Sequence, residues 1–258
     1  MPYLKLRDGA ELFYKDWGNA KDQVVTFSHG WPLSSDNWEN QMVFLGTQGY
    51  RVIAHDRRGH GRSTQTWYGN DINTFADDLQ QLFEYLDIKN AMMVGHSHGG
   101  GEVTRFLGRH GTSRVNKAVL VGAVPPLMLK SAANPEGTDK SDVPSGPFFG
   151  YNRPGVEKSE GQIRSWWQQG MNASFKSTYD SVKDFSETDF TADLKSINIP
   201  VLVLHGDDDQ VVPIQAAGQK SAELLPQGRL KVYPGGSHAI HNIQTDEVNK
   251  DLLDFLKA

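Results

Sequence analysis

The stretch that decides the fold runs from Met92 to Glu102 and reads MMVGHSHGGGE. An apolar run leads through Gly-His-Ser-His-Gly into a helix-compatible segment, which predicts a strand, a tight turn and a helix with Ser97 at the turn. A serine in such a turn adopts strained backbone angles, and Gly95 and Gly99 leave room where strand and helix cross. Its hydroxyl is then exposed at a helix N-terminus, where free N–H groups and the helix dipole suit an oxyanion. The motif alone also fits a glycine-rich turn with an incidental serine.

Strand and helix patterns alternate on both sides of this turn. The dipeptide Asp8-Gly9 is a hairpin signal between two extended stretches, which predicts an antiparallel sheet edge. Strands are expected at 3–7, 11–17, 24–29, 51–55, 115–122, 200–206 and 230–233, and helices near 35–48, 73–86, 214–225 and 245–256. Asn73 or Thr74 is expected to cap the second helix. The patterns predict an α/β fold, a mostly parallel doubly wound sheet with an antiparallel N-terminal hairpin and ligands at the carboxyl ends of the strands.

The pattern changes between Val124 and about Asn198. Prolines interrupt the first half of this segment, and residues 162–175 and 179–185 show helical spacing. An insertion without a strand pattern, placed after a sheet strand, is typical of a lid.

We therefore expect a core formed by residues 1–123 and 199–258, and a helical lid formed by residues 124–198. The lid is rich in aromatic side chains, and Trp166 and Trp167 are expected to line the substrate pocket. The alternative is that these rings only bury the lid against the core.

Composition limits the class of protein. A chain of 258 residues is long enough for one α/β domain with a full core. The formal charge of −5 indicates no nucleic-acid surface, so small neutral or weakly polar ligands are expected. The absence of cysteine excludes disulfides and thiolate nucleophiles. Because the sequence shows neither a signal-peptide pattern nor a run of about eighteen apolar residues, we expect a cytoplasmic protein without a membrane partner.

Three predicted strand ends offer the groups of a catalytic triad. A hydroxyl is a poor nucleophile at neutral pH, so it needs a base and a third group that orients the base. Ser97, an aspartate within Asp207–Asp209 and His238 supply these groups in the chain order of α/β-hydrolase triads. Asp209 is preferred because it lies deepest in its loop, whereas Asp207 directly follows a glycine and is suited to shaping the turn. Position alone leaves this choice open.

The base and the oxyanion donors are chosen from their neighbours in the chain. His238 directly follows a strand, whereas His241 is expected to be partly exposed at the start of the last helix. The strand beside the nucleophile strand ends in His-Gly-Trp-Pro, so the backbone N–H groups of Trp31 and His98 are predicted to form the oxyanion hole. The side chains of Trp31 and Pro32 are expected in the substrate pocket, or else in packing. The His98 side chain either carries protons or points into packing.

No metal or cofactor is expected. The remaining histidines lack the clustered spacing of a metal site, and Asp207–Asp209 lacks the spacing of a calcium loop. The run Asp56–Ser63 is rich in glycine and arginine but matches neither a P-loop nor a dinucleotide fingerprint. It predicts a structural turn held by Asp–Arg hydrogen bonds.

Six stretches of the sequence together resemble one known family. They are 29–32 (HGWP), 56–63 (DRRGHGRS), 95–103 (GHSHGGGEV), 186–190 (SETDF), 205–213 (HGDDDQVVP) and 233–238 (YPGGSH). Over nearly its whole length the chain resembles the cofactor-free (non-haem) haloperoxidases and related aryl esterases of the α/β-hydrolase fold. The resemblance implies Ser97 as nucleophile, Asp209 as acid and His238 as base, with the backbone N–H groups of Trp31 and His98 at the oxyanion.

The same resemblance implies two activities that share one acyl-enzyme. Water gives hydrolysis of small aryl or short-chain esters, and hydrogen peroxide gives a peracid that oxidises halide in solution without haem, vanadium or flavin. A small ester and hydrogen peroxide would be the partners. Members of the family often form trimers or hexamers, so a homo-oligomer is expected.

Two other functions remain open. Many relatives carry threonine or methionine in place of His98, whereas some cofactor-independent dioxygenases of this fold have histidine there, which keeps a dioxygenase as an alternative. The other is a non-catalytic small-molecule binding protein in which the triad only lines a pocket. A dehalogenase would need aspartate in place of Ser97.

Overall fold

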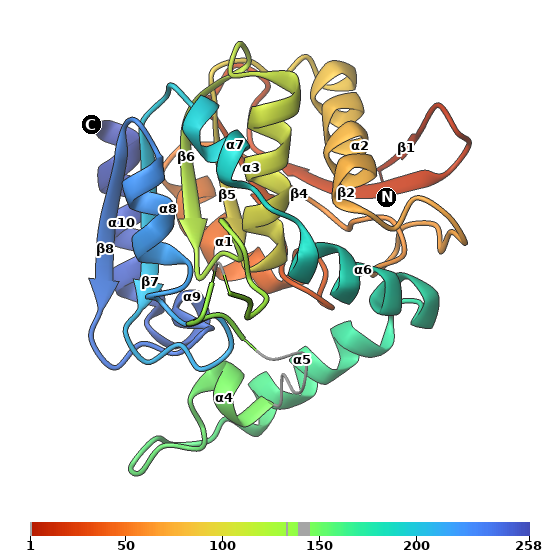
Figure 1. Cartoon of the computed structure of the whole chain (residues 1–258). Coiled ribbons are helices and arrows are strands. Elements are labelled where there is room, and N and C mark those ends of the chain that lie inside the picture. Colours follow the sequence, from red (N-terminus) through yellow and green to blue (C-terminus); the bar gives the residue numbers. More distant parts are fainter. Residues whose placement is uncertain (1, 133, 139–144) are drawn as a thin grey trace.

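The computed structural model describes residues 2–132, 134–138 and 145–258. Within these residues the strands form one eight-stranded sheet in the order β1-β2-β4-β3-β5-β6-β7-β8 (Figure 1). They are β1 (Tyr3–Lys5), β2 (Glu11–Trp17), β3 (Val24–Ser28), β4 (Arg51–His55), β5 (Ala91–His96), β6 (Val115–Val121), β7 (Val201–Gly206) and β8 (Gly228–Tyr233). β2 pairs antiparallel with β1 and β4, and the other pairs are parallel. The predicted fold class and its N-terminal hairpin are confirmed.

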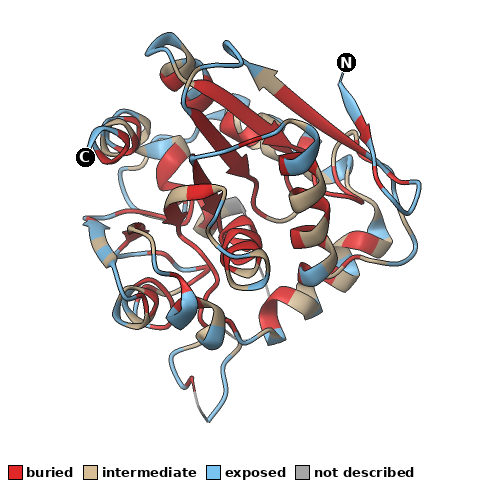
Figure 2. Cartoon of the chain, turned by 90° about the horizontal axis from the view of Figure 1, so that it is seen from above, coloured by how far each residue is buried: buried red, intermediate tan, exposed pale blue. Residues whose placement is uncertain are grey.

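Helices cover both faces of the sheet. They are η1 (Ser35–Trp38), α1 (Glu39–Thr47), α2 (Ile72–Tyr85), α3 (His98–His110), α4 (Ser145–Phe149), α5 (Glu160–Met171), α6 (Phe175–Glu187), α7 (Thr191–Ser196), α8 (Gly218–Leu224), α9 (Ile240–Ile243) and α10 (Thr245–Lys257). α1 and α10 pack on one face, and α2, α3 and α8 pack on the other. Because helices cover both faces, the strands in the middle of the molecule are buried, whereas the outer sides of the helices are exposed (Figure 2). None of the helices that the structure describes combines the length and apolar character needed to cross a membrane.

The start of α2 differs from the prediction. Asp71 is the N-cap residue, and its side chain accepts hydrogen bonds from the backbone N–H groups of Asn73 and Thr74 at 3.1 and 3.0 Å. The prediction that Asn73 or Thr74 caps the helix is therefore wrong. Both residues lie inside the first turn, because the carboxylate of Asp71 satisfies their otherwise free N–H groups.

The segment between β6 and β7 carries α4, α5, α6 and α7. Figure 1 shows α4 and α5 below the ends of β6, β7 and β8, where a lid over the carboxyl ends is expected. α7 instead packs against α3, since a Cβ atom at Gly108 would lie 2.2 Å from Asp193 Oδ1, and Leu194 belongs to the core. The lid boundaries at 124 and 198 stay a prediction, and residues 133 and 139–144 of that segment lie outside the described residues.

A buried ionic network ties α3 to the loops after β3 and β4. Glu102 of α3 has no exposed surface, accepts hydrogen bonds from Arg57 Nε and Nη2 at 3.1 and 2.7 Å, and lies 2.9 Å from His55 Nε2. Arg57 also donates to the backbone oxygen of His29 at 2.8 Å. Burial alone raises the pKa of Glu102, but Arg57 and His55 outweigh burial and lower it to about 2. The charged carboxylate therefore holds the two loops in place at neutral pH.

Replacing Glu102 with glutamine is expected to lower the free energy of unfolding at pH 7 by about 3–5 kcal/mol, because Arg57 would keep a buried charge without its counter-ion. The folded-state pKa of about 2 lies below the ordinary value of 4.5, so this stabilisation is complete above about pH 4.5 and is lost as the pH falls toward 2. Urea unfolding at neutral and acid pH measures both effects. The control Asp77→Asn removes solvent-accessible contacts with Arg109 and His110 and should cost less than about 1 kcal/mol. Equal losses in the two variants would contradict this account.

Candidate active site

Ser97 occupies the turn between β5 and α3. Its φ of 53° and ψ of −120° are angles that residues other than glycine rarely adopt. The crossing of strand and helix is tight, because a Cβ atom at Gly95 would lie 2.3 Å from the oxygen of Gly99, and one at Gly99 would lie 2.2 Å from the oxygen of Ser28. The predicted strand, strained turn and helix are confirmed.

A hydrogen bond joins Asp209 to His238 at the ends of neighbouring parallel strands, β7 and β8. Asp209 Oδ2 lies 2.8 Å from His238 Nδ1, and Oδ1 accepts the backbone N–H groups of Val211 and Val212 at 2.9 and 2.8 Å. Burial raises the pKa of Asp209, but His238 and His205 more than offset burial and hold the pKa below its ordinary value. Asp209 is thus a charged carboxylate that accepts a hydrogen bond from His238 Nδ1. The other ring nitrogen, Nε2, remains available.

His205 is a second partner of Asp209. Its Nε2 lies 3.2 Å from Asp209 Oδ2 and 2.8 Å from the backbone oxygen of Val212. From the sequence it is expected to be an ordinary core histidine, as strand-end histidines usually are. His205 lies at the end of β7, and Asp209 follows four residues later in the loop. This short spacing is the feature of the sequence that indicates the contact. Through these two contacts His205 holds the loop that carries Asp209 in place, as residues packed around reactive groups commonly do.

Two further buried histidines support the loop of His238. His96 Nε2 lies 3.0 Å from the backbone oxygen of His238, and the His96 ring lies 4.2 Å from that of His241. His241 has no exposed surface, so the prediction that it is partly exposed at the start of the last helix is wrong. It belongs to the short α9, which places its ring 4.8 Å from that of Trp38. Burial and, to a smaller extent, His238 lower the pKa of His241 to about 3, so its ring is neutral.

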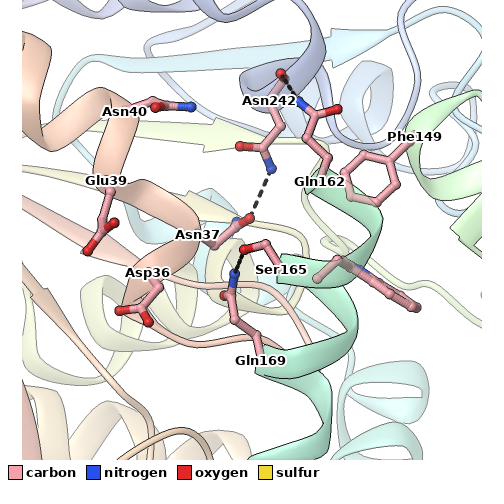
Figure 3. Close-up of a pocket in the computed structure, with 10 residues that line it drawn as sticks. Asp36, Asn37, Glu39, Asn40, Phe149, Gln162, Ser165, Gln169 and Asn242 are labelled. Atoms are coloured by element: carbon pink, nitrogen blue, oxygen red, sulfur yellow. Dashed lines mark hydrogen bonds between the residues drawn. The ribbon is translucent and has the colours of Figure 1, made fainter. Parts of the chain in front are cut away.

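A polar cavity of about 200 Å³ lies beyond His241, between α1, α5 and α9 (Figure 3). Asn37 and Asn242 in its wall lie 2.8 and 3.2 Å from His241 Nε2. Gln162 of α5 donates to the backbone oxygen of Asn242 at 3.1 Å. None of the three triad candidates lines this cavity. It marks the place where α5 is hydrogen-bonded to the core.

Two backbone N–H groups flank Ser97. β3 pairs with β5, and a Cβ atom at Gly30 would lie 3.3 Å from the Cβ of Ser97, so the loop that carries Trp31 passes beside the serine. Across the described ranges, no backbone or side-chain group accepts a hydrogen bond from the backbone N–H of Trp31 or of His98. Both donors are free for an oxyanion that forms at Ser97.

The four side chains predicted to line the substrate pocket separate into two groups. Pro32 lies against α5, and the ring of Trp31 lies 6.1 Å from that of Phe185 on α6. Trp166 of α5 packs against the rings of Phe148 and Phe149, and Trp167 is 61% exposed. Trp31 and Pro32 follow directly on Gly30, which lies beside Ser97, and the role of all four side chains in a substrate pocket stays a prediction.

Among the described residues, no hydrogen bond joins Ser97 Oγ to His238. Because Asp209 occupies Nδ1 of His238, Nε2 is the ring nitrogen that has no hydrogen-bond partner within the described ranges. Hydrogen bonds between catalytic groups are often long without substrate and shorten in the complex.

Comparison with known proteins shows the family to which the chain belongs. A family model described as the alpha/beta hydrolase fold matches residues 23–143 and 128–242. The chain is 49% identical to a non-heme haloperoxidase of Rhodococcus erythropolis and 49% identical to a bifunctional esterase/perhydrolase of Acinetobacter calcoaceticus, in both cases over 100% of each chain. The crystal structure of a bromoperoxidase from Bacillus anthracis is similar with a TM-score of 0.91 and 39% identity, covering 96% of each chain. The chain belongs to the α/β-hydrolase family, and within it to the non-haem haloperoxidases and related esterases, which confirms the resemblance.

Proposed function

We propose that this protein is a serine esterase that cleaves small aryl or short-chain carboxylic esters and also makes peracids from hydrogen peroxide. The observation that carries the proposal is the buried Asp209–His238 hydrogen bond, formed beside a serine in a strained turn with two free backbone N–H groups. Full-length relatives named non-heme haloperoxidase and esterase/perhydrolase support the same pair of activities.

The first half of the reaction transfers the acyl group to Ser97. His238 Nε2 takes the serine proton while Oγ attacks the ester carbonyl. The negative charge on the carbonyl oxygen is stabilised by hydrogen bonds from the N–H groups of Trp31 and His98. Asp209 keeps the imidazole oriented and stabilises its charged form. His238 then protonates the leaving alcohol, and the acyl group stays on Ser97.

The second half releases the acyl group. His238 deprotonates water or hydrogen peroxide, which attacks the acyl-enzyme and gives a carboxylic acid or a peracid. The peracid oxidises halide in solution, so no step calls for a cofactor. A dioxygenase and a binding protein are not favoured, since the named relatives are haloperoxidases and an esterase/perhydrolase. Assembly into a trimer or hexamer, which the resemblance implies, is part of the proposal.

A panel of p-nitrophenyl esters assayed with and without hydrogen peroxide tests this function. We expect p-nitrophenol release from short acyl esters in buffer alone. Peroxide and bromide together should give halogenation of monochlorodimedone that depends on the ester or its acid as acyl donor. Oxygen consumption with an acidic heteroaromatic compound, and no release from any ester, would overturn the proposal in favour of a dioxygenase.

A further inference from the structure

Four buried side chains, one of which directly follows Ser97 in the chain, carry polar atoms that have no hydrogen-bond partner within the described ranges. They are both ring nitrogens of His98, Nε2 of His60, Nη1 of Arg57 and Oγ of Ser181. Each of these residues is at most 1% exposed. Leaving a buried polar group unpaired is costly, so four such side chains call for a common explanation.

Ring contacts bring two of these groups, His98 and Arg57, together around Phe75, and His29 links His60 to Arg57. The His98 ring lies 5.6 Å from the Phe75 ring, and the guanidinium of Arg57 lies 5.2 Å from the centre of the same ring. The His60 ring lies 5.4 Å from that of His29, whose backbone oxygen accepts a hydrogen bond from Arg57. The start of α3 and the loop after β4 therefore face each other across one phenylalanine.

Helix α6 closes this region and contributes the fourth group. Ser177, Ser181 and Phe185 are spaced four residues apart, so they lie on one face of the helix. Ser177 Oγ donates to the backbone oxygen of Arg58 at 3.4 Å, and the Phe185 ring lies 4.9 Å from the His98 ring. Ser181 lies between these two contacts. Figure 1 shows α6 below α2 and α3.

The four side chains together with Glu102 carry no net charge, and they offer both donors and acceptors. Burial and then Arg57 lower the pKa of His60 to about 3 and hold that of His98 well below its ordinary value, so both rings are neutral. His60 Nδ1 lies 3.1 Å from the backbone oxygen of Arg58 and carries the proton, which leaves Nε2 as an acceptor. Arg57 is paired with Glu102, and its Nη1 is a donor. A hydroxyl group both donates and accepts, so it matches this set, whereas a carboxylate only accepts.

A surface cavity lies on the outer side of Trp31, and none of these four groups lines it. It has a volume of about 580 Å³, and Trp31, Thr178, Val182 and Ser186 contribute to its wall. The ring of Trp31 lies 6.1 Å from that of Phe185, which is the ring in contact with His98. Trp31 and Phe185 therefore stand between the cavity and His98.

We propose that His98, with Ser181, His60 and Arg57, forms a subsite that binds a hydroxyl group on the acyl chain and so selects hydroxyacyl esters. The inference rests on the proposed function, because the acyl group must be attached to Ser97, the neighbour of His98. A wholly apolar acyl site would disfavour the same hydroxyl, since burying it without a partner is costly.

The test compares kcat/KM for the p-nitrophenyl esters of butyric, 2-hydroxybutyric and 3-hydroxybutyric acid. We expect the wild type to prefer one hydroxy ester over butyrate, and this preference to fall at least about tenfold in His98→Met and in Ser181→Ala, the effect of losing about one hydrogen bond. His98→Gln keeps a donor and an acceptor and should retain more of the preference than His98→Met. The matched control is Ser177→Ala, on the same helix face, whose hydroxyl already has a partner in Arg58 and which should leave the ratio unchanged.

Each other outcome has a definite meaning. An unchanged ratio in His98→Met and Ser181→Ala, with butyrate still cleaved, overturns the subsite and leaves the esterase standing. That result is expected if buried water alone joins these groups. A wild type without preference for either hydroxy ester overturns the subsite as well. If the wild type cleaves none of the three esters, the proposed function fails and the subsite fails with it. Should His98→Met not fold, Ser181→Ala and His98→Gln decide the question.

Discussion

Replacing Ser97 with alanine is expected to lower kcat for p-nitrophenyl acetate by on the order of 10⁴- to 10⁶-fold. The variant keeps the free backbone N–H groups beside the turn but loses the hydroxyl that would carry the acyl group. Peracid formation should fall by the same factor, because both activities pass through one acyl-enzyme. Assays of p-nitrophenol release and of halogenation with peroxide measure the two losses.

The control for this substitution is Ser196→Ala. Ser196 ends α7, is exposed, and donates from Oγ to the backbone oxygen of Asp193 at 2.7 Å. Both activities should be unchanged in this variant. Ester hydrolysis that survives Ser97→Ala undiminished would refute the shared nucleophile, and oxygen consumption retained by the same variant would favour a dioxygenase.

Replacing Asp209 with asparagine is expected to lower kcat by about 10⁴-fold. An amide in this position can donate to His238 Nδ1, which stabilises the tautomer that has its proton on Nε2 and is unable to accept the serine proton. The pKa of Asp209 lies below its ordinary value, so the wild-type carboxylate is charged and the loss should be similar from about pH 6 to 9. Measuring kcat across this range for both proteins tests the effect.

The neighbouring aspartates are the matched controls. Asp207 and Asp208 are exposed, whereas Asp209 is 5% exposed. Asp207 Oδ1 accepts the backbone N–H of Gly235 at 2.7 Å, a contact that shapes the loop. Asp207→Asn and Asp208→Asn should therefore change kcat little. A loss in either one that exceeds the loss in Asp209→Asn would show that the acid is assigned to the wrong residue.

Features that depend on local pattern are predictable from this sequence. The parallel strands are short apolar runs because helices bury them on both faces, and the glycines around Ser97 are required where backbone atoms nearly touch. The run Asp56–Ser63 forms the expected turn, in which Arg62 Nε donates to Asp56 Oδ2 at 2.7 Å. In each case residues close in the chain determine the geometry.

Features that depend on distant segments are not predictable in the same way. From its pattern, His241 is expected to be exposed at the start of a helix. In the structure α9 instead places its ring against that of Trp38, a residue from the N-terminal part of the chain. α8 begins at Gly218, later than its pattern suggests, because residues 214–217 form turns after Pro213. The surroundings of His98 come partly from α6, so its unpaired nitrogens become visible only in the folded chain.

Mass spectrometry of the protein, acid-quenched during turnover of p-nitrophenyl acetate, tests the central claim most directly. We predict an acetyl group on the peptide that carries Ser97, lost more quickly when hydrogen peroxide is present and absent from Ser97→Ala. Turnover with no acetyl group on Ser97, or with the acetyl group on another residue, would contradict the account.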